Sequence, residues 1–147
     1  MMANYWPHLL AMLVGGALTV QVGMNATLAR VIGSPLWASA VNFAIGLLAL
    51  VGFAVVAGSR ASAGSCGQVP PWAWIGGLLG AAYVASVTIL GPRLGGMTLV
   101  ALVIAGQLIV ALVVDQFGIL GYPQIAVTPT RLLGAALLLV GALLVMR

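Results

Sequence analysis

The chain has 147 residues, of which 63% are hydrophobic and 4% are charged, and its mean hydropathy is +1.25. Soluble domains carry about 25% charged residues, so this composition excludes a solvated globular surface and predicts an integral membrane protein. Five arginines against one acidic residue give a net charge of +4. The arginines are far apart and lie between apolar stretches. This pattern favours anchoring at lipid headgroups over binding of nucleic acid.

Five apolar segments follow one another, each long enough to cross a hydrocarbon core of about 30 Å. We predict an all-α membrane protein whose transmembrane helices form one five-helix domain, residues 1–147, with spans over residues 8–29, 36–57, 72–90, 95–115 and 129–146. Gly91-Pro92 is expected to end the third span. Thr128 is expected to cap the fifth, with Pro129 at its first helical position.

The arginines barely specify an orientation in the membrane. An odd number of spans puts the termini on opposite sides, with Arg60 and Arg131 on the N-terminal side and three arginines on the other: Arg30, Arg93 and Arg147. With three arginines on one side of the membrane and two on the other, the positive-inside rule hardly favours either orientation. Two alternatives stay open: a weak preference for one orientation, or dual topology, in which copies insert both ways and pair antiparallel as inverted halves.

Polar side chains inside the spans are the candidates for substrate binding. Gln21 and Asn25 are four residues apart, hence on one face of the first span. Gln107 lies near the middle of the fourth span, where an amide without a partner costs several kcal/mol. Four spans bring amides and hydroxyls to similar depths, which predicts a polar cavity; the alternative is ordinary hydrogen bonding between helices. The candidate substrate-binding residues are Gln21, Asn25, Asn42, Phe43, Tyr83 and Gln107.

Asp115, the only acidic residue, ends the fourth span, and Arg131 begins the fifth on the same side of the membrane. The two residues predict either a structural ion pair or a site that exchanges a proton or cation during transport. Gly134 and Gly141 are seven residues apart on one face of the fifth span. These small residues predict a dimer interface or, equally, close packing within the chain.

The residues needed for catalysis or metal binding are sparse. His8 is the only histidine and is far in sequence from Cys66, the only cysteine, which argues against a metal site. No nucleophile motif joins a serine to His8 and Asp115, and no glycine motif for phosphate binding is present. We therefore expect no enzymatic activity, no cofactor and no metal.

Several motifs occur in order along nearly the whole chain: Gln21-x-x-x-Asn25-x-x-Leu28, Gly33-x-Pro35, Phe43-x-x-Gly46, Pro71-Trp72-x-Trp74-x-Gly76-Gly77-x-x-Gly80-Ala81-x-Tyr83, Pro92-x-Leu94-Gly95, Gly106-Gln107, Asp115-x-Phe117-Gly118, and Arg131-x-x-Gly134 ahead of Gly141. Together they resemble the YdcZ-like family of small five-span proteins in the drug/metabolite transporter superfamily. The resemblance implies a multi-pass protein of the bacterial inner membrane, found as paired five-span chains or as ten-span fusions of inverted halves. It also implies a secondary transporter, often described as an exporter.

One feature departs from the superfamily's small multidrug pumps, which use a glutamate in the first helix. The first span here has Gln21 and Asn25 and no acid, which disfavours simple antiport of protons and cationic drugs. We predict an exporter subunit that moves a small polar metabolite or drug by alternating access. Its partner is a second copy in an antiparallel homodimer, or a related five-span chain. Neutral amides favour an uncharged or zwitterionic substrate. A small dual-topology channel and a non-transporting accessory subunit are the alternatives.

Overall fold

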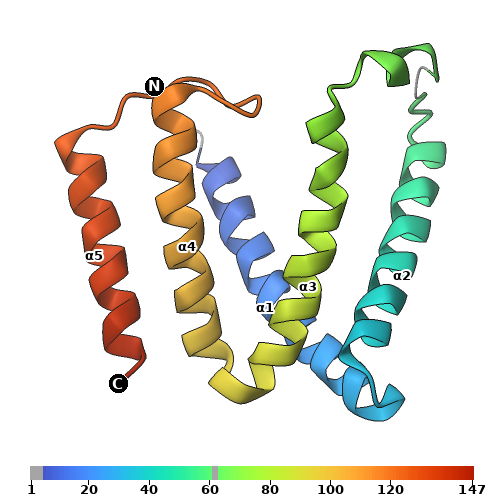
Figure 1. Ribbon diagram of the computed structural model, residues 1–147, viewed down its shortest axis with the longest axis horizontal. Coiled ribbons are helices and arrows are strands. Elements are labelled where there is room, and N and C mark those ends of the chain that lie inside the picture. The colour runs from blue at the N-terminus through green and yellow to red at the C-terminus, as the bar shows by residue number, and fades with distance from the viewer. Residues whose placement is uncertain (1–4, 61–62) are drawn as a thin grey trace. The chain divides into compact units, whose positions relative to one another are not determined.

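The computed structural model describes residues 5–60 and 63–147. These residues form helices and no strands: α1 (Trp6–Ile32), α2 (Pro35–Val56), the short 3-10 helices η1 (Ala63–Gln68) and η2 (Pro71–Trp74), α3 (Ile75–Leu94), α4 (Gly96–Phe117) and α5 (Pro129–Val145) (Figure 1). Four segments are long and apolar enough to cross a membrane, and α5 is a shorter apolar helix. The predicted all-α, five-helix membrane protein is confirmed.

Contacts between residues divide the chain into two compact units, Met1–Arg93 and Leu94–Arg147. In the first unit α1 packs against α2, and in the second α4 packs against α5. The predicted single five-helix domain stays a prediction, because these contacts define each unit separately.

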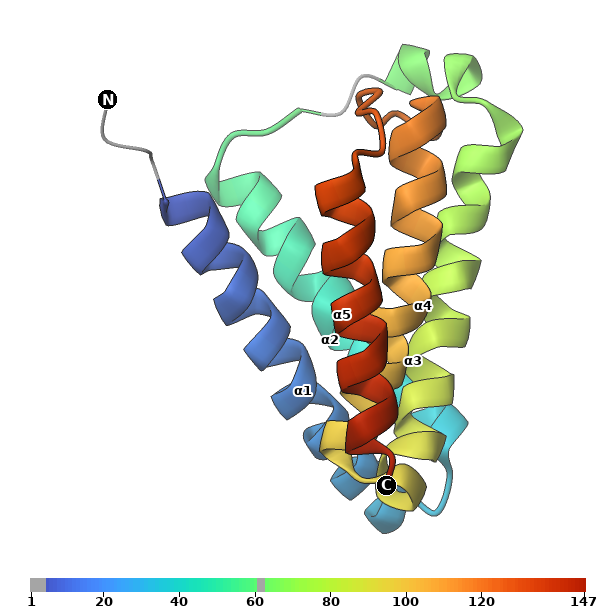
Figure 2. The ribbon, with the colours of Figure 1, turned by 90° about the vertical axis from the view of Figure 1, so that its left-hand side faces the viewer.

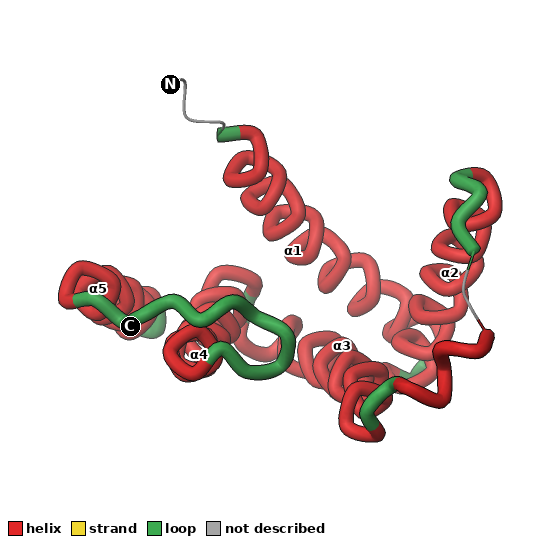
Figure 3. The backbone as a smooth tube through the Cα atoms, turned by 90° about the horizontal axis from the view of Figure 1, so that it is seen from above, coloured by secondary structure: helices red, strands yellow, loops and turns green. Residues whose placement is uncertain are grey.

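The turn between α1 and α2 follows from local sequence. Gly33 ends α1 with φ +79°, a conformation that glycine adopts without steric cost. Ser34 then caps α2, its hydroxyl oxygen accepting a hydrogen bond from the Trp37 amide at 3.3 Å, and Pro35 occupies the first helical position. The two helices are closest beside this turn and diverge away from it (Figures 1 and 3). The residues that they bury are small or polar: Asn25, Ala29, Ala38 and Ser39.

Helix α3 does not end at the Gly91-Pro92 pair, so that expectation is wrong. The helix continues through Pro92 and ends at Leu94. Pro92 lacks the N–H that would bond to the carbonyl of Thr88, but only two residues of the helix follow it, so the rest of the helix keeps its bonds. A single linking residue, Gly95, follows with φ +79° before α4 begins at Gly96.

Helices α4 and α5 lie side by side and run antiparallel (Figure 2). Thr128 caps α5 as predicted: its hydroxyl oxygen accepts from the Arg131 amide at 3.3 Å. The α5 residues that are buried are Ala135 and Ala142, seven positions apart and therefore on one face. With 17 residues, α5 is about 25 Å long, close to the minimum for a span.

Candidate functional site

An amide pair joins α1 and α2 within their apolar spans. Gln21 donates from Nε2 to Oδ1 of Asn42 at 3.4 Å, and both side chains are half-buried. Both line a cavity of about 430 Å³ whose other lining residues are apolar, with Phe43, Leu50 and Val84 among them. This cavity, called here the α1–α2 cavity, therefore combines a small polar patch with an apolar lining, as small-molecule sites do.

Phe43 connects the α1–α2 cavity to α3. Its Cζ lies 3.7 Å from the position that a Cβ on Gly80 would occupy, which is ordinary van der Waals contact. The absence of a side chain at Gly80 therefore leaves room for the phenyl ring beside α3. Two other predicted site residues of this unit lie outside the cavity lining: Asn25 is 4% exposed, one turn along α1 from Gln21, and Tyr83 is half-buried on α3.

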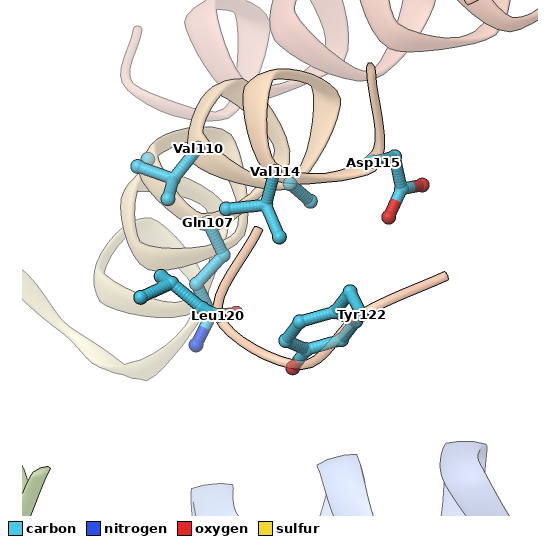
Figure 4. Close-up of a pocket in the computed structure, with 8 residues that line it drawn as sticks. Gln107, Val110, Val114, Asp115, Leu120 and Tyr122 are labelled. Carbon is cyan, nitrogen blue, oxygen red and sulfur yellow. The ribbon is translucent and has the colours of Figure 1, made fainter. Parts of the chain in front are cut away.

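The second unit contains a cavity of about 610 Å³ between one face of α4 and the loop that follows this helix. Gln107, Val114 and Asp115 line it from α4, while Leu120 and Tyr122 line it from the loop. Figure 4 shows the loop passing beneath the face of α4 that bears Gln107 and Val114, with Asp115 farther along the helix. Gln107 thus lines a cavity of its own unit, called here the α4 cavity.

An ion pair ties the ends of α4 and α5. Nη2 of Arg131 donates to Oδ2 of Asp115, and the side chains are 35% and 17% exposed. Two further bonds hold the loop to the same pair: the Ile125 amide donates to the carbonyl of Asp115 at 2.8 Å, and Nη1 of Arg131 donates to the carbonyl of Ile125 at 3.3 Å. The structure therefore brings together the two residues predicted as a structural or coupling pair.

Gln116 holds the rest of the loop. Its Oε1 accepts from the Val127 amide at 2.8 Å, and its carbonyl accepts from Nε2 of Gln124 at 3.1 Å. Gly118 allows this close approach: it has φ +59°, and a Cβ there would lie 2.8 Å from Cβ of Gln124. Gln116, Leu120 and Tyr122 were missed by the sequence analysis. The glycines at 118 and 121 could have indicated a chain reversal, but not which side chains the loop would return to α4.

The predicted dimer residues stand apart from the packing inside the chain. A Cβ added at Gly134 or Gly141 would meet no atom within 4 Å in the described part of the chain, whereas the neighbouring Ala135 and Ala142 are buried. Packing within this unit therefore uses the alanines and leaves the glycines open. Among residues 5–60 and 63–147, no three His, Cys, Asp or Glu side chains gather in a group that could hold a metal ion.

Comparison with known proteins identifies one family. The model of the family described as "Putative inner membrane exporter, YdcZ" matches residues 6–144. No curated protein matches the chain, and no solved structure does.

Proposed function

The chain belongs to the YdcZ family of inner membrane exporters, and from this premise we propose that it is one subunit of a secondary transporter that works by alternating access. It is a multi-pass inner membrane protein of a family of transporters, not of enzymes. The observation that carries the proposal is the pairing of Gln21 with Asn42 at a cavity inside bilayer-length helices. Polar groups are costly at this depth, and a cavity that exposes them therefore supports a substrate path between these helices.

The amide pair keeps hydrogen-bonding capacity for a substrate. One N–H of Gln21 is used by Asn42, which leaves the Gln21 carbonyl oxygen as an acceptor and the Asn42 amide nitrogen as a donor. Within the described residues of this unit, no other side-chain hydrogen bond involves either amide. A neighbouring donor and acceptor suit a metabolite that is uncharged or zwitterionic. Phe43 supplies an apolar wall.

Assembly into an antiparallel dimer would supply the inverted halves that alternating access requires. The open face at Gly134 and Gly141 supports this part of the proposal, because small residues allow close helix approach in lipid. The nearly balanced arginines support insertion in both orientations. A related five-span chain would serve the same role as a second copy.

The function is tested by loading proteoliposomes with labelled glutamine, serine and uridine, which are zwitterionic or uncharged. We expect saturable uptake that is accelerated by unlabelled compound on the opposite side, and loss of this uptake in Gln21→Leu and Asn42→Leu. Thr19→Val is the matched control, since the Thr19 hydroxyl bonds to the Gly15 carbonyl on its own helix and touches neither amide. Flux that rises linearly without exchange would indicate a channel. No flux of any probe, with assembly altered by Gln107→Ala, would indicate an accessory subunit.

The dimer is tested by adding bulk to the open face of α5. We expect Gly134→Leu and Gly141→Leu to reduce chemical cross-linking between two chains in the membrane. Ala136→Leu is the control, because it adds the same side chain to an exposed position about 200° around the helix from Gly134. Tags at each terminus that appear on both sides of the membrane would support dual topology. A single orientation and unchanged cross-linking would contradict this part of the proposal.

A further inference from the structure

The α4 cavity contains two polar side chains, Gln107 and Tyr122, that have no hydrogen-bond partner among the residues of their own unit. The side-chain hydrogen bonds of this unit involve the loop and the adjoining helix ends, and among its described residues none involves Gln107 or Tyr122. Gln107 lies near the middle of α4, a helix long enough to cross a membrane, and its side chain is exposed within this unit. An amide at that depth needs a hydrogen-bonding partner, because leaving it unpaired costs several kcal/mol.

The charges at the cavity argue for an uncharged ligand. Asp115 lines the cavity, but its charge is balanced by Arg131. An anion would be repelled by the Asp115 carboxylate, and a cation would add a net positive charge next to Arg131. The remaining wall is apolar, with Val110, Val114 and Leu120. A molecule with an apolar body and one uncharged hydrogen-bonding group fits this lining.

Hydrogen bonds hold the loop that lines one side of the cavity. Leu120 has φ +59°, a conformation that costs a residue with a Cβ about 1–2 kcal/mol. The bonds from Gln116 to Val127 and Gln124 hold the loop in place despite this cost. A strained residue that lines a cavity is typical of a functional site, and a cover fixed in advance lowers the entropy lost on binding.

We propose that the α4 cavity binds an uncharged amphipathic molecule, with its polar group on the Gln107 amide and its apolar body between α4, Leu120 and Tyr122. The volume of about 610 Å³ lies within the range of small-molecule sites. This inference adds a second ligand site to the transporter proposed above and rests on that function for its biological role. Binding itself is measured without transport.

The test uses three probes that share a phenylethyl or benzyl body and differ in charge: 2-phenylethanol, 2-phenylethylammonium and phenylacetate. Each is titrated by calorimetry into the full-length protein in lipid nanodiscs, with empty nanodiscs as the reference for partitioning into lipid. We expect saturable binding of 2-phenylethanol, weakened about tenfold by Gln107→Leu and by Tyr122→Ala. Thr19→Val is the control and leaves the affinity unchanged. Tyr122→Phe keeps the ring and is expected to weaken binding less than Tyr122→Ala, which provides a readout if a larger change unfolds the protein.

Three results would overturn the proposal. The first is the absence of saturable 2-phenylethanol binding to the folded protein. The second is tighter binding of the ammonium probe that is lost in Asp115→Asn, which would assign the cavity to cations. The third is loss of binding in Gln21→Leu but not in Gln107→Leu, which would move the ligand to the α1–α2 cavity. If 2-phenylethanol binds as expected but no probe is transported, only the proposed function fails.

Discussion

Replacing Gly118 by alanine should destabilise the loop that covers the α4 cavity. The substitution forces a residue with a Cβ to adopt φ +59°, which costs about 1–2 kcal/mol. The new Cβ would also lie 2.8 Å from Cβ of Gln124 and 3.1 Å from its backbone nitrogen and Cα. Relieving an overlap of this kind costs about 1–3 kcal/mol, since backbone must move. The expected loss in the free energy of unfolding is therefore about 2–5 kcal/mol.

Gly121→Ala separates the two contributions. Gly121 has φ +85°, but a Cβ there meets no atom within 4 Å in the described part of the chain. In this variant the free energy of unfolding should fall only by the conformational cost of a positive φ, about 1–2 kcal/mol. Both variants are unfolded with SDS in mixed micelles, and the transition is followed by circular dichroism. Affinity for 2-phenylethanol is measured in parallel, because the same loop carries Leu120 and Tyr122. If the two variants lose equal free energy, the close approach of Gly118 to Gln124 does not constrain the loop.

Three further predictions concern bonds between elements. A double-mutant cycle of Gln21→Leu and Asn42→Leu in SDS unfolding should give a coupling free energy of about 0.6 kcal/mol, which is typical of hydrogen bonds between membrane helices. If the two losses are additive, the hydrogen bond between Gln21 and Asn42 does not contribute to stability. Asp115→Asn and Arg131→Gln should each lower the free energy of unfolding by about 1–3 kcal/mol, a value between those of exposed and buried ion pairs. The double variant should lose less than the sum of the two single losses, as measured by the thermal midpoint in detergent. Ser34→Ala should cost about 1 kcal/mol through loss of the α2 cap, and an unchanged midpoint would exclude that role.

The helical architecture could be predicted from sequence because it depends on local properties. The number of apolar segments and their lengths follow from composition, and Thr128-Pro129 and Gly33-Ser34-Pro35 mark helix ends through their own backbone chemistry. The pairing of Asp115 with Arg131 could also be predicted, since they are the charged residues at the two ends of the connection between the fourth and fifth spans. Position along the chain was enough for these features.

Which polar residues meet was decided by the tertiary structure. Gln21 bonds to Asn42, while Asn25, one turn along the same face of α1, is buried. Gln107 lines a cavity whose other wall is the loop with Leu120 and Tyr122. These outcomes depend on how each helix is rotated and where the loop folds back. In a soluble helix the polar face indicates which side of the helix is turned away from the core. A span that is apolar all round has no polar face, so its sequence gives little indication of how the helix is rotated about its axis. Sequence therefore determined the helices and their ends, and only packing determined the cavities.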